Sequence, residues 1–189
     1  MLACGARLVL PDGAEYPPLL RETPDPPAAL YARGRTFVPG PAVAVVGSRR
    51  ASRAGLESSR LLSAGLARAG VTVVSGFARG IDAAAHGAAI GAGGATVAVF
   101  GCGIDVCYPP EQGRLLEDLL RAGTVFSEFR MGAPPLPMNF PVRNRVIAGM
   151  VPLVLVVEAA ERSGSLITAR LAAEYGRDVA AVPLSLIHI

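Results

Sequence analysis

From Ala42 onward, short apolar runs rich in β-branched residues alternate with alanine- and leucine-rich stretches. The apolar runs have the length and composition of strands, and the stretches between them are typical of helices. The pattern predicts strands at 42–46, 71–74, 96–100, 124–126, 153–157 and 179–182. It predicts helices at 54–69, 82–92, 111–122, 141–149 and 166–175.

Near-continuous apolar strands such as residues 42–46 are typical of a parallel sheet that is covered on both faces. Right-handed crossover connections then place helices on both faces of such a sheet. We therefore expect an α/β fold with a doubly wound, mostly parallel, Rossmann-like sheet over residues 42–183.

The two ends of the chain differ from this pattern. Residues 1–41 contain eight prolines, which leave little room for regular structure, so we expect a proline-rich lead-in segment. Residues 184–189 read Leu-Ser-Leu-Ile-His-Ile, a peptide that one frame of a common transposase-based sequencing adapter also encodes. We expect this end to be a sequencing-adapter scar on a truncated reading frame, and we exclude it from functional reasoning.

Composition narrows the class of protein. The 189 residues suffice for one domain with a single core. No apolar run approaches the roughly 18 residues of a membrane span, and no signal peptide is visible, so we expect a cytoplasmic protein with no membrane partner. Three cysteines without a C-x-x-C pair predict reduced thiols and no metal site. All 18 basic residues are arginine, but the net charge of +3 identifies no ligand.

Ligands of doubly wound sheets bind beyond the carboxyl ends of the strands, so the loops that follow strands are the first candidates. Gly47, Ser48 and Arg49 follow the first predicted strand and lead into a helix. Glycine permits close backbone approach, free N–H groups at a helix start attract anions, and the guanidinium fork of arginine matches phosphate. The alternative is a plain tight turn with solvated arginines.

The loop after the second predicted strand carries two glycines on either side of an arginine, which indicates a second phosphate contact. Its candidate residues are Ser75, Gly76, Arg79 and Gly80. We expect Asp82 to cap the following helix, with an ion pair to an arginine, rather than to act in catalysis. His86 has no nucleophile or second histidine at a useful spacing, so a packed helix histidine is expected.

A helix start crowded with cations precedes the fifth predicted strand. Asn139 is the expected cap of this helix, and a proline in the first turn is tolerated. Arg143 and Arg145 are two positions apart and project to different sides of the helix. We expect one of them to bind the ligand and the other to contact an internal carboxylate, with Glu128 or Asp82 as candidates.

A fourth loop, Ser163-Gly164-Ser165, follows the fifth predicted strand and opens a helix with Thr168 on its first turn. Each loop alone is weak support for a ligand site. Four such loops at one edge of a sheet favour a polyanionic ligand. The candidate binding residues are Gly47, Ser48, Arg49, Ser75, Gly76, Arg79, Gly80, Arg143, Asn144, Arg145, Ser163, Gly164, Ser165 and Thr168.

Signatures of nucleotide-dependent enzymes are missing from the sequence. There is no G-x-x-x-x-G-K-[ST] motif, which argues against a Walker-type ATPase. Gly101-Cys102-Gly103 has only the first two glycines of a dinucleotide fingerprint and follows the third strand, so NAD binding is disfavoured. No G-x-S-x-G elbow is visible. We predict no catalytic residue, no metal and no cofactor.

Several of these motifs, taken in order along nearly the whole chain, resemble the DNA processing protein A (DprA/Smf) family. The segments Ser75–Asp82 and Arg143–Arg145 are the most specific to it; Val45–Arg49, Gly101–Asp105, Phe140–Arg145 and Ser163–Ala169 match as well. The resemblance implies single-stranded-DNA binding in a basic pocket, a homodimer, and delivery of incoming DNA to the recombinase RecA during natural transformation. It makes the fourteen candidate residues DNA-binding candidates.

A nucleotide-processing enzyme is the competing hypothesis, because the family's fold is similar to that of the LOG-type phosphoribohydrolases. Those enzymes carry a Pro-Gly-Gly-x-Gly-Thr motif, to which Ser163–Thr168 bears only a distant similarity. We therefore favour a recombination mediator over an enzyme. Few aromatic residues are available to stack on DNA bases, and Phe77 and Phe140 are the nearest candidates.

Overall fold

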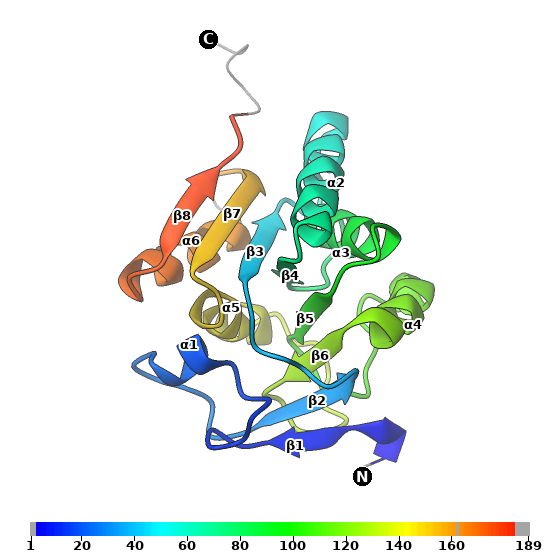
Figure 1. Cartoon of the computed structure of the whole chain (residues 1–189), viewed down its shortest axis with the longest axis vertical. Helices are drawn as coiled ribbons and strands as arrows, with labels where there is room; N and C mark the ends of the chain where they lie inside the picture. The colour runs from blue at the N-terminus through cyan, green and yellow to red at the C-terminus, as the bar shows by residue number, and fades with distance from the viewer. Residues whose placement is uncertain (1–2, 162, 184–189) are drawn as a thin grey trace.

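Eight strands form one mixed sheet in the order β1-β2-β6-β5-β4-β3-β7-β8 (Figure 1). The computed structural model of the chain describes residues 3–161 and 163–183. Strands β3 to β8 pair in parallel, and β1 and β2 add an antiparallel edge, so the expected mostly parallel α/β sheet is confirmed. The strands are β1 (Arg7–Val9), β2 (Leu30–Gly34), β3 (Ala42–Gly47), β4 (Thr72–Ser75), β5 (Thr96–Phe100), β6 (Thr124–Ser127), β7 (Leu153–Glu158) and β8 (Asp178–Ala181).

The helices form two layers. Helices α2, α3 and α4 connect β3 to β6 in one direction along the sheet and contact one another in sequence. Helices α5 and α6 lead back to β7 and β8 and pack together, with α1 beside α5 (Figure 1). Right-handed crossovers that run in opposite directions place the two sets on opposite faces. Their bounds are α1 (Pro18–Arg21), α2 (Arg53–Arg68), α3 (Ile81–Gly91), α4 (Gly113–Ala122), α5 (Asn139–Gly149) and α6 (Gly164–Glu174), with 3₁₀ turns at Ala3–Gly5 and Pro110–Gln112.

Helix α2 shows how the sequence fixes one of these elements. Ser52 is its N-cap, and the Ser52 hydroxyl accepts a hydrogen bond of 3.0 Å from the Gly55 amide. Small residues at every fourth position form its buried stripe, which lets the backbone of α3 come close. These residues are Gly55, Ser59, Ser63 and Ala67. The Ser59 hydroxyl donates to the Ile81 carbonyl at 3.1 Å, so the two helices are also joined by a buried hydrogen bond.

The expectation of little regular structure in residues 1–41 is wrong for β1, α1 and β2. Strand β2 pairs with β6, with Tyr31 opposite Ser127, and β1 pairs with β2. Tyr16, Leu20 and Leu30 are at most 1% exposed and lie in the core on the α5 side of the sheet. The prolines interrupt the segment between these short elements, which leaves room for two short strands. The interpretation of residues 184–189 as an adapter scar falls outside the described part of the chain.

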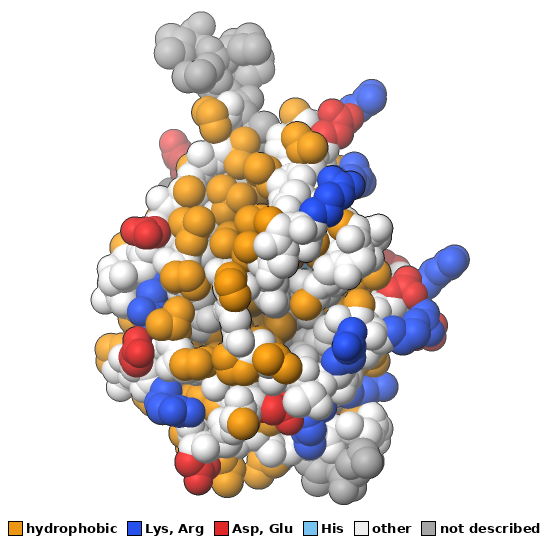
Figure 2. All heavy atoms as spheres, in the orientation of Figure 1, with side chains coloured by type: hydrophobic (Ala, Val, Ile, Leu, Met, Phe, Trp, Pro, Cys, Tyr) orange, Lys and Arg blue, Asp and Glu red, His pale blue; other side chains and the backbone are white. Residues whose placement is uncertain are grey.

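On the α2 side of the sheet, α2, α3 and α4 pack over the central strands, whereas β7 and β8 carry half-buried apolar side chains. Figure 2 shows hydrophobic side chains gathered over this part of the surface. Leu153, Leu155, Ala180 and Val182 contribute to it. Within the described residues, no helix is long and apolar enough to cross a membrane.

The connections change direction at β3, which lies between β4 and β7. The chain leaves β3 through α2 toward β4, and it reaches β7 only after crossing to the other face through α5. Gly47 at the end of β3 pairs with Glu158 at the end of β7, with a register shift between Val46 and Gly47. In open α/β sheets, such a switch point leaves a crevice at the carboxyl ends of the two strands.

Candidate nucleic-acid interface

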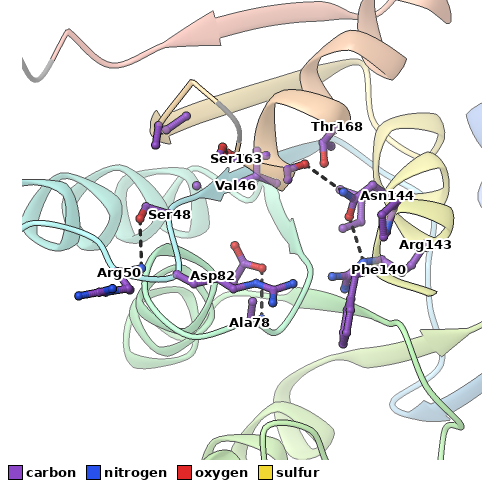
Figure 3. Close-up of a pocket in the computed structure, with 18 of the residues that line it drawn as sticks. Val46, Ser48, Arg50, Ala78, Asp82, Phe140, Arg143, Asn144, Ser163 and Thr168 are labelled. Carbon is purple, nitrogen blue, oxygen red and sulfur yellow. Dashed lines mark hydrogen bonds between the residues drawn. The ribbon is translucent and has the colours of Figure 1, made fainter. Parts of the chain in front are cut away.

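A cavity of about 880 Å³ opens at the switch point between β3 and β7 (Figure 3). Its walls come from five segments that are far apart in the sequence, as expected for a site at the carboxyl edge of the sheet. They are residues 46–50 at the end of β3 and in the turn after it, Ala78 and Asp82 around the start of α3, Pro135, Pro137, Phe140, Pro141, Arg143, Asn144 and Ile147 before and in α5, residues 158–160 at the end of β7 and after it, and Ser163, Gly164, Ser165 and Thr168 at the start of α6. Tyr108 closes the remaining side.

A second cavity of about 250 Å³ adjoins the first. The two share a wall, and Gly76, Phe100 and Arg79 belong to the smaller one alone. The shared residues are Arg49, Arg50, Ala78, Tyr108, Phe140 and Arg143. Arginine and aromatic side chains therefore separate two connected hollows.

The turn after β3 is fixed by close packing on both sides. A β-carbon at Gly47 would lie 2.6 Å from Ile81 and 2.9 Å from the Glu158 carbonyl oxygen, so only glycine fits. The Ser48 amide donates to that carbonyl at 2.7 Å, and the Ser48 hydroxyl accepts from the Arg50 amide at 3.1 Å. Both Arg49 and Arg50 remain exposed at the rim of the cavity.

Aromatic rings line the rim beside these arginines. The Arg49 guanidinium carbon lies 4.9 Å from the centre of the Phe140 ring, a cation–π contact that orients it. The Tyr108 ring lies 5.7 Å from the Phe140 ring. Phe77, by contrast, is 1% exposed and packs against Phe100, so the expectation that it is available for base stacking is wrong.

The loop after β4 packs against the turn after β3. Gly80 has a φ of +76°, and a β-carbon there would collide with the Ser48 carbonyl oxygen. The Ser75 hydroxyl is buried and donates to the Val45 carbonyl at 2.6 Å, which places it in the sheet rather than in either cavity. Arg79 is exposed, lines the smaller cavity and forms an ion pair with Glu111.

Asp82 does not cap α3 in the expected way. Gly80 occupies the N-cap position, and Asp82 is the second residue of the helix, where its carboxylate accepts a hydrogen bond of 3.2 Å from the Ala78 amide. Burial raises the pKa of Asp82, and the positive charge of Arg143 opposes this shift. The carboxylate thus folds back onto the loop that precedes its helix. The cap at 80 is a glycine because the position needs a positive φ.

Arg143 is 4% exposed and forms the floor between the cavities. Its guanidinium donates to the backbone carbonyls of Gly76 and Val99 and to the Asn144 side chain at 3.2 Å. Burial lowers the pKa of Arg143 to about 10, and the nearby Asp82 carboxylate opposes this shift. Most of its donors are therefore committed to the protein.

Arg145 lines neither cavity. It pairs with Glu128 and also reaches Asp25, so it joins α5 to the N-terminal segment. Glu128 is thus the internal carboxylate expected for one of the two arginines. Asn139 is the first residue of α5 rather than its cap, because Met138 occupies the cap position. The Asn139 side chain instead donates to the Pro134 carbonyl at 3.2 Å.

The amino end of α6 opens onto the main cavity. Ser163 is the N-cap, and its side chain makes no capping hydrogen bond; it lies 2.5 Å from the Ser165 hydroxyl instead. The Asn144 side chain donates to the Gly164 carbonyl at 3.0 Å and so ties α6 to α5 (Figure 3). The Leu166 amide donates to the Ser163 carbonyl at 3.1 Å, but no capping side chain satisfies the Gly164 and Ser165 amides, which are suited to an anion.

The structure brings together most of the candidates proposed from sequence. Those that line the main cavity are Gly47, Ser48, Arg49, Arg143, Asn144, Ser163, Gly164, Ser165 and Thr168. Gly76 and Arg79 line the smaller cavity, whereas Ser75, Gly80 and Arg145 line neither. Sequence reasoning missed Arg50, Tyr108 and Glu158. Arg50 follows Arg49 directly in the loop after β3. Tyr108 lies in the loop after β5 and Glu158 ends β7, so both could have been examined as residues at the carboxyl edge of the sheet.

His86 and the three cysteines belong to residue types that can also bind metals. His86 is fully buried, and its Nδ1 lies 2.7 Å from the Thr96 hydroxyl, as expected for a packed helix histidine. Cys4, Cys102 and Cys107 are free thiols. In residues 3–161 and 163–183, no three His, Cys, Asp or Glu side chains gather in a way that could hold a metal ion.

Comparison with known proteins identifies close relatives. The family model for DNA recombination-mediator protein A matches residues 7–188. Protein Smf of Escherichia coli is 48% identical over 178 residues, which are 93% of this chain and 48% of that protein. The X-ray structure of DNA processing protein A from Streptococcus pneumoniae superposes with a TM-score of 0.89 at 44% identity and covers 96% of this chain and 64% of that one.

DNA processing protein A from Helicobacter pylori, whose structure is described in terms of a unique single-stranded-DNA binding mode, superposes with a TM-score of 0.86 at 26% identity. The match covers 97% of this chain and 83% of that one. The chain spans about half the length of the curated relatives it matches. The family model, the sequence relatives and the structures agree with the resemblance seen in the motifs. The chain belongs to the DNA recombination-mediator protein A family.

Proposed function

We propose that this chain binds single-stranded DNA in the cavity at the switch point and serves as a recombination mediator rather than as an enzyme. One observation carries the proposal. Two exposed arginines and an uncapped helix start converge on one cavity at the carboxyl edge of the sheet. Positive charge and free backbone N–H groups in this arrangement are complementary to a phosphate chain.

The arginines at the rim are available to a ligand. Among the described residues, neither Arg49 nor Arg50 forms an ion pair with a carboxylate, whereas Arg79 is paired with Glu111. A guanidinium that has no internal carboxylate partner breaks no ion pair when it binds phosphate. Arg49 and Arg50 are therefore the first phosphate contacts that we assign, and Arg79 contributes less.

The walls of the cavity favour a single strand over a duplex. Phe140 and Tyr108 present rings next to the arginines, and both rings line the two cavities. Unpaired bases can stack on such rings, whereas the bases of a duplex are already stacked on one another. The Helicobacter pylori relative, described as a single-stranded-DNA binder, supports the same ligand class for this chain.

The wider role rests on family membership. We propose that the full protein forms a homodimer in the cytoplasm and delivers incoming single strands to RecA during natural transformation. The family match favours this role over a nucleotide-processing enzyme of the LOG type. Residues Gly47, Ser48, Arg49, Arg143, Asn144 and the Ser163–Ser165 turn form the proposed interface, with Thr168 behind them.

A titration of a labelled oligonucleotide tests the proposal. We expect the chain to bind a single strand at least tenfold more tightly than the corresponding duplex at the same salt concentration, and to release no free base from nucleoside monophosphates. Equal affinity for the two forms would contradict single-strand recognition. Release of free base, abolished by a substitution in the cavity, would support the enzyme instead.

A further inference from the structure

The amino ends of α2 and α6 are both connected to the main cavity, α2 through Glu158 and α6 through Ser163, and they are in different states. At α6 the N-cap residue Ser163 leaves the first amides without a capping side chain. At α2 the carboxylate of Glu158 already occupies the anion position. The Ser52 amide donates to both Glu158 carboxylate oxygens, at 3.0 and 3.1 Å, and the Ser52 hydroxyl lies 2.5 Å from Oε2.

The first turn of α2 is shaped around this carboxylate. A β-carbon at Gly55 would collide with Glu158 Oε2. A glycine within a helix is less favourable than alanine, so its presence here is explained by the space that the carboxylate needs. The Glu158 main-chain oxygen also accepts from the Ser48 amide at 2.7 Å, which fixes the residue at the end of β7. Glu158 is therefore held in a fitted place.

The carboxylate changes where phosphate can bind. Glu158 lines the main cavity together with Arg49 and Arg50, and Asp82 adds a second carboxyl group to the wall. A bound carboxylate neutralises the partial positive charge of a helix start and repels a second anion at the same place. The uncapped start of α6 and the exposed arginines at the rim remain open to phosphate.

We propose that Glu158 is a specificity-determining residue that excludes phosphate from the amino end of α2. It thereby confines the DNA backbone to Arg49, Arg50 and the start of α6. This proposal rests on the proposed function of the site. It assigns to Glu158 the role of an internal anion that takes the place a phosphate would otherwise fill.

The test compares Glu158→Gln with Glu161→Gln, which removes the same charge from an exposed neighbour outside the cavity lining. Each variant is titrated with a single-stranded oligonucleotide and with an abasic deoxyribose-phosphate oligomer of the same length. Glu158→Gln is expected to raise the affinity for the abasic oligomer about fivefold more than that for the ordinary strand, because an extra phosphate site becomes available. Glu161→Gln is expected to change both affinities equally. The proposal would be overturned if Glu158→Gln, like Glu161→Gln, changed the affinities for the two oligomers equally. A loss of affinity for both oligomers in Glu158→Gln would also overturn it.

A second measurement uses inorganic phosphate and no DNA. Phosphate is expected to raise the thermal unfolding midpoint of Glu158→Gln more than that of the wild type or Glu161→Gln, since a ligand that binds only the folded state stabilises it. Equal shifts in all three proteins would contradict the role of Glu158. If Glu158→Gln does not fold, Glu158→Ala is used, because the Ser52 hydroxyl still caps α2 through Gly55. Failure of the wild type to bind single strands would refute the proposed function, while the phosphate shift would still decide the role of Glu158.

Discussion

Arg143 lies directly against Gly76, where a β-carbon would come within 2.7 Å of both terminal guanidinium nitrogens. The same guanidinium donates to the Gly76 and Val99 carbonyls, so it joins the carboxyl ends of β4 and β5 to α5. The glycine at position 76 is therefore required by an internal arginine. This relationship makes Arg143 the structural centre of the edge that carries the cavity.

Substitution Gly76→Ala is expected to destabilise the fold by about 1–3 kcal/mol, because the new methyl group overpacks the site and displaces Arg143. Gly87→Ala is the matched control, since a β-carbon at that exposed position in α3 meets nothing within 4 Å. The control is expected to gain up to about 1 kcal/mol from better helix propensity. Denaturant unfolding of the two variants measures both effects. Equal stability of Gly76→Ala and the wild type would refute the packing argument.

Arg145 is expected to act in stability and not in DNA binding. Its side chain is 15% exposed and pairs with Glu128 and Asp25, away from both cavities. Arg145→Ala should lower the free energy of unfolding by about 1–3 kcal/mol, since it removes hydrogen bonds to charged partners. The salt dependence of single-strand binding should not change at temperatures where the variant is folded. A flatter salt dependence would place Arg145 at the interface.

Phe140 is expected to stack on a base, and Phe77 is not. Phe140→Ala should weaken single-strand binding by about 1–3 kcal/mol, the usual contribution of one aromatic–base stack. Phe77→Leu changes a side chain that is 1% exposed, so it should alter the unfolding free energy and leave the affinity unchanged. Fluorescence titration of both variants with the same oligonucleotide provides the comparison. Unchanged affinity in Phe140→Ala would argue against a stacking role.

Acid should destabilise the protein through His86. Burial lowers the pKa of His86 from its ordinary 6.5 to about 3, and the positive charge of Arg143 adds to the shift. Between these values the unfolded chain binds a proton that the folded chain does not, so stability is complete above pH 6.5 and falls as the pH drops toward 3. From pH 7 to pH 5 the wild type should lose about 2 kcal/mol more than His86→Leu in chemical unfolding. An identical loss in both proteins would contradict a buried neutral histidine.

The alternation of apolar and helical segments predicted the central sheet well, because buried parallel strands such as β3 are apolar on both faces. It missed β1 and β2, two short strands within the proline-rich segment that extend the sheet beyond β6. Short edge strands owe their structure to a neighbour that is distant in sequence. No local pattern within residues 1–41 identifies β6 as that neighbour.

The binding loops were predictable as a group, but the task of each side chain was not. Arg143 and Arg145 look equivalent in sequence, yet one lies under the cavity and the other joins the N-terminal segment. Ser75 and Gly80 lie at the end of a strand and in the loop after it, as ligand-binding residues do. The Ser75 hydroxyl instead donates to the Val45 carbonyl within the sheet, and Gly80 allows close approach to the Ser48 carbonyl. Glu158 was not among the binding candidates. Its pairing with Ser52 joins residues 106 positions apart, which the sequence does not show.

The salt dependence of single-strand binding by Arg49→Ala tests the central claim most directly. Arg53→Ala is the control, because Arg53 is exposed on α2, pairs with Glu57 and lines neither cavity. Each phosphate contact contributes about 0.7 to the log–log slope for a single strand, so Arg49→Ala should bind more weakly and with a slope flatter by about 0.7. Arg53→Ala should keep the wild-type slope. If Arg49→Ala retained both the affinity and the slope of the wild type while folded, the cavity at the switch point would not be the DNA site.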